Sequence, residues 1–170
     1  DSVASRGLGD VYKRQLLIAQ EKWKLQSEVL WSDRNEILPY KNLTEAITMA
    51  SIIEKEGLEK NKIAGVFINR LRIGMKLQSD PTVIYALGKD FDGDIKRKDL
   101  RIDNPYNTYR YKGLPPGPIS IVSEESLEAA LNPEETDFLY FVSMKNGFHK
   151  FSKNLTEHNE AVLKYQINER

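Results

Sequence analysis

The chain has 170 residues, enough for one domain with a substantial buried core. Its 25 Lys and Arg residues balance its 25 Asp and Glu residues, which argues against nucleic acid as a partner. The absence of cysteine excludes disulfides, thiolate metal sites and a cysteine nucleophile. Because His149 and His158 are the only histidines, a histidine metal site is not expected either. A neutral polymer or a small polar substrate remains open.

The first segment, residues 1–15, lacks clear hydrophobic periodicity, and its end resembles translated sequencing adaptor. We expect it to be a non-native leader outside the fold, with the native domain at residues 16–170. Residues 16–31 are typical of a helix. No signal peptide opens the chain, and no apolar run approaches the roughly 20 residues that a membrane span needs.

The next predicted helix covers residues 43–57. Asn42 precedes it and Glu45 follows three residues later, the order of a capping box. Asn61 is expected to cap a further helix that ends at Gly74. Asp80 is expected to cap a short helix over residues 81–87, because a proline follows it at the first helical position.

Residues 91–120 are rich in proline, glycine and asparagine, with prolines that suit neither helix interiors nor central strands. We expect an ordered loop that forms one wall of a cleft. A helix over residues 123–131 follows, then strands at 138–144 and 148–151 around Asn146 and Gly147, a strong hairpin signal, and a last helix at 156–167. These elements predict an α+β fold of helices with a small antiparallel β element.

Glu54 is the first candidate for chemistry. On a helical wheel it projects between Ile47 and Ala50, on the apolar face of its helix, whereas Glu56 falls on the polar flank. A carboxyl group against apolar surface loses hydration, so we expect a raised pKa and no loss of stability when Gln replaces it. A carboxyl group that stays protonated near pH 7 suits the general acid of glycosidic bond cleavage.

Two other interpretations of Glu54 stay open. Its carboxylate can reach water at the edge of the apolar face, or it can pair with a buried arginine such as Arg70 or Arg72.

Six short blocks occur in the order found in one known family. They are ASIIEKE at residues 50–56, VFINRL at 66–71, LQSDPTVIY at 77–85, YNTY at 106–109, GLPPGPI at 113–119 and YFV at 140–142. On these blocks the chain resembles the YceG-like family over roughly residues 16–165. The resemblance implies a murein lytic transglycosylase, which cleaves the β-1,4 bond between N-acetylmuramic acid and N-acetylglucosamine within glycan strands and leaves 1,6-anhydro ends.

The resemblance also implies a catalytic residue, a set of partners and a location. The first Glu of the ASIIEKE block matches Glu54, which would protonate the glycosidic oxygen and then take a proton from the muramoyl C6 hydroxyl. No cofactor and no metal are implied. The implied partners are peptidoglycan glycan strands and cell-wall synthases. The implied location is the outer face of the bacterial cytoplasmic membrane. The family's single-pass anchor and LysM-like subdomain are expected to lie outside residues 1–170.

Several residues of these blocks are candidates for substrate binding. Amide, hydroxyl and phenol groups suit sugar hydroxyls and N-acetyl groups, and aromatic faces suit stacking. Each could instead satisfy loop backbone, and Asp80 could be a helix cap or a second carboxylate. Asn154, with His149 and His158, is placed on the other rim of the site. The candidates are Gln78, Asp80, Tyr106, Asn107, Thr108, Tyr109 and Asn154.

Three alternatives to the lytic enzyme remain. One is a hydrolase that uses Glu54 with Asp80, and another is a non-catalytic glycan-binding scaffold. An aminodeoxychorismate lyase, a label used within the family, is disfavoured because the sequence has no glycine-rich loop to hold the phosphate of pyridoxal phosphate.

Overall fold

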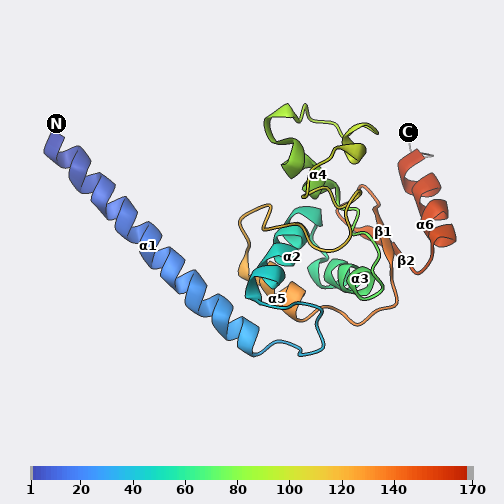
Figure 1. Cartoon of the computed structure of the whole chain (residues 1–170), viewed down its shortest axis with the longest axis horizontal. Helices are drawn as coiled ribbons and strands as arrows, with labels where there is room; N and C mark the ends of the chain where they lie inside the picture. Colours follow the sequence, from blue (N-terminus) through green and yellow to red (C-terminus); the bar gives the residue numbers. More distant parts are fainter. Residues whose placement is uncertain (1, 168–170) are drawn as a thin grey trace. The chain divides into compact units, whose positions relative to one another are not determined.

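The computed structural model describes residues 2–167 and divides into two units, one that ends at Arg34 and one that begins at Asn35. The first unit consists mainly of α1 (Ser2–Ser32), so the helix predicted from residue 16 already begins at Ser2 (Figure 1). The expectation that residues 1–15 are a non-native leader stays a prediction. Among the described helices, none is both long and apolar enough to cross a bilayer.

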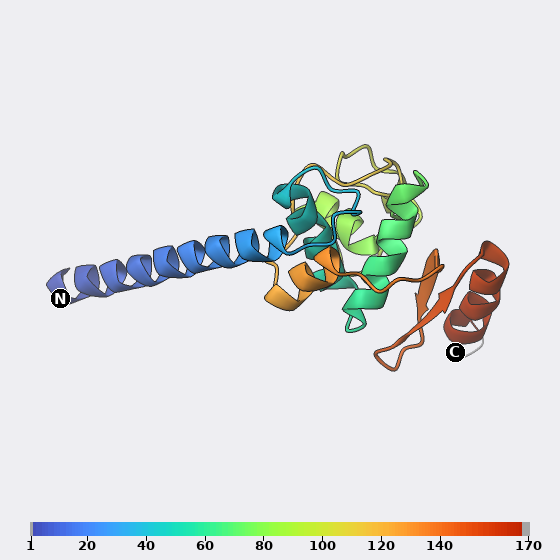
Figure 2. The ribbon, with the colours of Figure 1, turned by 90° about the horizontal axis from the view of Figure 1, so that it is seen from below.

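Three helices form the core of the second unit: α2 (Leu43–Glu56), α3 (Lys60–Arg72) and α5 (Glu124–Leu131) (Figure 2). The predicted cap of α2 is confirmed, because Asn42 Oδ1 accepts a hydrogen bond from Glu45 N at 3.0 Å. The predicted cap of α3 is wrong. Asn61 lies inside that helix, and its amide donates to Asn132 O at 3.2 Å. The fully buried side chains include Met49, Ile52, Ile53, Ile63, Val66, Phe67, Leu127 and Leu131.

The segment after α3 begins with α4 (Asp80–Leu87) and the short 3₁₀ turns η1 (Gly88–Asp90) and η2 (Asp99–Arg101). Ser79, not Asp80, is the N-cap residue of α4, so the capping role predicted for Asp80 is wrong. Its carboxylate accepts a hydrogen bond from Tyr109 instead.

The C-terminal part is a hairpin followed by a helix. β1 (Tyr140–Ser143) pairs antiparallel with β2 (His149–Ser152), and α6 (Leu155–Val162) continues into η3 (Leu163–Ile167). α6 lies beside the hairpin in both views (Figures 1 and 2). Helices with one small antiparallel sheet confirm the predicted α+β fold.

The C-terminal end of α2 is held close to this hairpin at Gly57. A Cβ at Gly57 would lie 2.7 Å from His149 Cε1, so no side chain fits there without movement. His149 is held in turn by Glu59, whose Oε2 accepts from His149 N at 2.7 Å and lies 3.3 Å from His149 Nδ1. The close approach fixes where the last residue of α2, Glu56, meets the hairpin.

Gly57→Ala should therefore destabilise the second unit by about 1–3 kcal/mol, because the methyl group overlaps the imidazole. Urea unfolding followed by circular dichroism measures the loss. In a His149→Ala background the same substitution should cost less than half as much. An equal cost in both backgrounds would show that the contact with His149 is not the cause.

Candidate functional site

A cavity of about 670 Å³ lies where the end of α2, the start of α4, the hairpin and α6 meet. It brings together residues from six separate parts of the sequence. They are Glu56, Arg70, Gln78, Asp80, Tyr109, Tyr140, Phe141, Val142, Ser143, His149, Leu155, His158, Asn159 and Gln166. Three of the predicted substrate-binding residues, Gln78, Asp80 and Tyr109, therefore share one cavity.

Glu56 contributes to this cavity a buried carboxyl group with a raised pKa. Burial raises its pKa to about 7, against the opposing effect of a hydrogen bond that its Oε1 accepts from Ser79 Oγ. The charge of Asp80 raises the pKa further, and the charge of Arg70 lowers it. A carboxyl group with this pKa is partly protonated at neutral pH and can act both as an acid and as a base.

Asp80 and Tyr109 form a pair beside Glu56. Tyr109 Oη donates to Asp80 Oδ1 at 2.6 Å, and burial together with this bond raises the pKa of the Tyr109 phenol. Gln78, two residues before Asp80, has a φ of 51°, a left-handed conformation that is uncommon for a residue other than glycine. Its amide side chain and the Asp80 carboxylate are both exposed and line the cavity, where they can meet a ligand.

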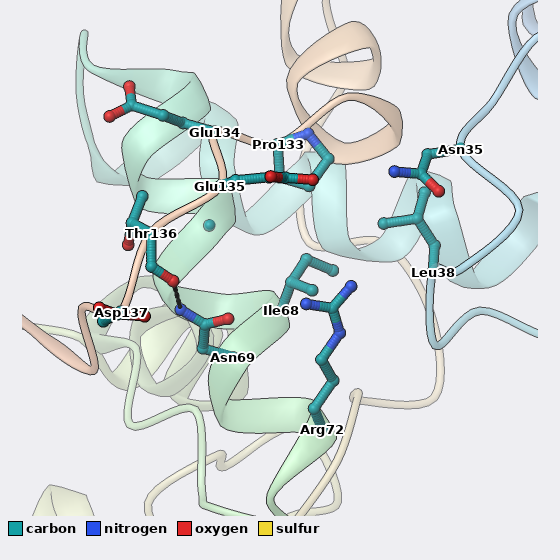
Figure 3. Close-up of a pocket in the computed structure, with 11 residues that line it drawn as sticks. Asn35, Leu38, Ile68, Asn69, Arg72, Pro133, Glu134, Glu135, Thr136 and Asp137 are labelled. Carbon is teal, nitrogen blue, oxygen red and sulfur yellow. Dashed lines mark hydrogen bonds between the residues drawn. The ribbon is translucent and has the colours of Figure 1, made fainter.

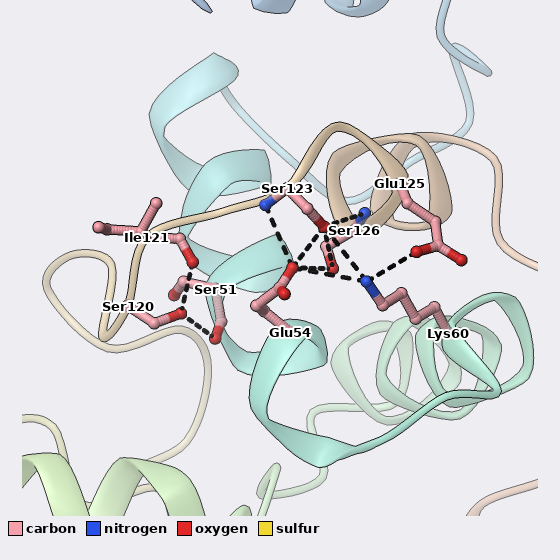
Figure 4. A network of polar contacts seen from close by, with 8 residues as sticks. All are labelled: Ser51, Glu54, Lys60, Ser120, Ile121, Ser123, Glu125 and Ser126. Atoms are coloured by element: carbon pink, nitrogen blue, oxygen red, sulfur yellow. Dashed lines mark hydrogen bonds and ion pairs between the residues drawn. The ribbon is translucent and has the colours of Figure 1, made fainter. Parts of the chain in front are cut away.

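Glu54 lies outside this cavity, in a different network (Figure 4). Its Oε2 accepts hydrogen bonds from Ser123 N at 3.1 Å, Ser123 Oγ at 2.5 Å and Ser126 Oγ at 2.5 Å, and lies 3.6 Å from Lys60 Nζ. These donors, chiefly the two serine hydroxyls, lower its pKa to about 2. Glu54 thus ties the N-terminus of α5 to α2 as a carboxylate.

The physical premises for Glu54 are therefore wrong. The predicted rise in its pKa is contradicted, and its cationic partner is Lys60, not Arg70 or Arg72. The helical wheel located the contact face correctly but could not show that the contact is the polar N-terminus of α5. The helical wheel also placed Glu56 on a solvated flank of the helix. In the structure the chain turns at Gly57, and the hairpin and α4 cover that flank.

The other predicted residues support the loop that carries Tyr109. Asn107 is fully buried, donates to Leu100 O and Ile102 O, and accepts from Tyr109 N at 3.0 Å. Thr108 is buried too, and its Oγ1 accepts from Ser79 N at 3.0 Å.

Two further predicted residues lie outside the cavity lining. The Tyr106 ring packs on Tyr85 with centroids 4.7 Å apart. Asn154 caps α6, where its Oδ1 accepts from Glu157 N at 3.0 Å, and its substrate-binding role stays a prediction. Of the proposed rim residues, His149 and His158 do line the cavity.

Other cavities lie elsewhere in the second unit. One, of about 450 Å³, is lined by α3 and residues 133–137, where Asn69 Nδ2 donates to Thr136 O (Figure 3). Another, of about 670 Å³, is lined by the first half of α2 and by residues 112–116. The proline-rich part of the predicted cleft wall thus borders a different cavity from the one that holds Glu56.

Comparisons with known proteins converge on one family. A family model described as the YceG-like family matches residues 10–164. A protein of Bacillus subtilis (strain 168) named endolytic murein transglycosylase is 55% identical over 122 residues, which are 70% of this chain and 34% of that protein. A protein of the same name from Streptococcus pneumoniae serotype 2 (strain D39 / NCTC 7466) is 36% identical over 157 residues, 83% of this chain and 28% of that protein.

A solved structure is similar as well. The 2.6 Å crystal structure of a yceG-like protein from Listeria monocytogenes matches with a TM-score of 0.67 and 51% identity, over 71% of this chain and 40% of that one. The chain thus spans 34% or less of the length of the two named relatives.

Glu54→Gln should destabilise the second unit at pH 7 by about 1–3 kcal/mol, because the carboxylate that receives these donors is lost. The folded pKa of Glu54 lies below the unfolded value of 4.5, so its stabilisation is present above pH 4.5 and is lost as pH falls toward 2. Urea unfolding of both forms at several pH values measures the difference. The control is Glu125→Gln, which removes a largely exposed partner of Lys60 and should cost about 0.5 kcal/mol or less. Equal losses in the two variants would contradict the assigned network.

Glu56→Gln should have the opposite pH signature. The folded pKa of about 7 lies above the unfolded 4.5, so ionisation destabilises the wild type as pH rises from 4.5 to 7. The glutamine of the variant cannot ionise, so the variant is not destabilised as pH rises. Its free energy of unfolding should exceed that of wild type by roughly 1–3 kcal/mol at pH 8, with little difference at pH 4. A difference that does not change with pH would refute the raised pKa.

Proposed function

Because the chain belongs to the YceG-like family, we propose that it carries the catalytic part of an endolytic murein transglycosylase, with Glu56 as its proton donor and acceptor. The observation that carries the proposal is the cavity in which the Glu56 carboxyl, of pKa about 7, lies with Asp80, Tyr109 and Gln78. The substrate is the glycan strand of peptidoglycan, the murein that the relatives' name specifies.

A lytic reaction needs one group that works first as an acid and then as a base. Protonated Glu56 gives its proton to the oxygen of the β-1,4 bond between N-acetylmuramic acid and N-acetylglucosamine as that bond breaks. The resulting carboxylate takes the proton of the muramoyl C6 hydroxyl, whose oxygen bonds to C1. The product is a 1,6-anhydro end, and no water is consumed. The proton taken from the C6 hydroxyl restores the protonated form of Glu56.

The carboxylate of Asp80 gives this reaction electrostatic support. An oxocarbenium-like centre is positive, so a carboxylate in the same cavity stabilises it. Asp80 is held by Tyr109 and also favours the protonated form of Glu56. The hydrolase alternative now pairs Asp80 with Glu56, because Glu54 lies outside the cavity.

Glu54 remains the acid that the sequence resemblance implies, and the protonation states argue against it. A carboxyl group with a pKa of about 7 can hold a proton near neutral pH, whereas the donors around Glu54 lower its pKa to about 2 and keep it ionised there. We therefore assign Glu54 the role of fixing α5 against α2.

The location follows from the substrate. Peptidoglycan lies outside the cytoplasmic membrane, so we propose that the domain acts there. A single-pass anchor, a LysM-like subdomain and cell-wall synthases as partners remain expectations from the resemblance.

The test compares Glu56→Gln and Glu54→Gln on purified sacculi, with mass spectrometry of the released muropeptides. Wild type should release 1,6-anhydro ends, and its rate should fall as pH rises above about 7. Glu56→Gln should lose at least about 100-fold in rate while it stays folded. Glu54→Gln should keep a measurable rate per folded molecule, judged by circular dichroism.

Each other outcome has a definite meaning. Reducing ends in place of anhydro ends would establish the hydrolase. Full activity in Glu56→Gln with loss in folded Glu54→Gln would return the catalytic role to Glu54. A folded wild-type chain that binds sacculi without releasing any product would favour the glycan-binding scaffold.

A further inference from the structure

Arg70 is a buried charge in the cavity with unused hydrogen-bonding capacity. Only 6% of the residue is exposed. Its Nε donates to Leu139 O at 2.6 Å and its Nη1 to Leu77 O at 2.5 Å, and it has no ion pair with any carboxylate that the structure describes. A guanidinium has five N–H donors, and the Glu56 carboxyl, whose charge acts on Arg70, forms no ion pair with it, so the buried cation is only partly compensated. The arrangement therefore favours an anion that enters from outside the chain.

The wall that leads from Arg70 toward α6 is free of acids. The Arg70 guanidinium carbon lies 5.3 Å from the centre of the Tyr140 ring. The His158 ring stacks on the same tyrosine, with ring centres 5.1 Å apart. Asn159 and Gln166 continue the lining with neutral amides. The acidic residues of α6, Glu157 and Glu160, do not line the cavity.

Arg70 lies within electrostatic reach of Glu56 and Tyr109, and its guanidinium also lies beside Tyr140. The cavity therefore combines carboxyl groups with a buried cation. The N-acetylated sugar rings are neutral, so their hydroxyl and amide groups suit the carboxyl groups. The carboxylates of the peptides that murein strands carry on their muramoyl residues are anionic and suit the cation.

We propose that the part of the cavity lined by Arg70, Tyr140, His158 and Asn159 binds a carboxylate of the peptide on the muramoyl residue next to the cleaved bond. The inference rests on the proposed function, because the ligand is a part of that substrate. Arg70 supplies the charge, and the amide of Asn159 supplies a neutral polar contact at the exposed rim. The enzyme then discriminates peptide-bearing strands from bare glycan.

The experiment measures binding in a Glu56→Gln background, which prevents turnover. Three probes are titrated by calorimetry: the N-acetylglucosaminyl–N-acetylmuramoyl disaccharide with its peptide, the same compound with every carboxylate converted to an amide, and the disaccharide without peptide. The peptide-bearing probe should bind about tenfold more tightly than either of the others. Raising the salt from about 50 to about 500 mM should reduce this preference.

Substitution at the rim tests the location without disturbing the buried arginine. Asn159→Asp should weaken binding of the charged probe by about three- to tenfold and leave both neutral probes unchanged. Lys164→Gln, on η3 outside the cavity lining, changes the net charge by the same amount and should leave the preference intact. Equal affinity for the charged and amidated probes, equal effects of the two variants, or no binding of any probe would overturn the inference. Anhydro ends from wild type on sacculi would stand independently of these results.

Discussion

The geometry of the site depends on α2, because this one helix binds the proline-rich loop and α5 and also reaches the cavity. Ser51 Oγ accepts from Ile119 N at 2.9 Å and so fixes the end of the proline-rich loop. Glu54, three residues on, binds the N-terminus of α5, and Glu56 reaches the cavity at the last turn. A helix is stiff over this length, so loop, α5 and cavity are placed relative to one another by its fixed geometry.

Two carboxyl groups on one turn of this helix are thereby driven to opposite states. Glu54 meets hydroxyl, amide and ammonium donors, which stabilise the anion. Glu56 is buried close to the Asp80 carboxylate, and both effects stabilise its neutral, protonated form. Spacing along the chain says little about either environment, because each is created by a segment distant in sequence: Ser123 for Glu54, and Asp80 with the hairpin for Glu56.

Several local signals in the sequence were reliable, although the caps predicted at Asn61 and Asp80 were wrong. The cap at Asn42, the end of α4 at Gly88 and the hairpin around Gly147 were all predicted, since each depends on a residue's own backbone preference. Gln78, Asp80 and Tyr109 were predicted as substrate-binding residues and line one cavity. Glu56 and Arg70 were not predicted to line it, because only tertiary packing shows that they face a cavity.

The left-handed backbone of Gln78 has a consequence for the stability of the fold. Glycine adopts that conformation freely, whereas glutamine in it costs about 1 kcal/mol. The conformation is maintained by the neighbouring chain, since Gln78 N donates to Thr108 O and Ser79 N donates to Thr108 Oγ1. The glutamine side chain at this position therefore comes with a cost in folding stability that glycine would avoid.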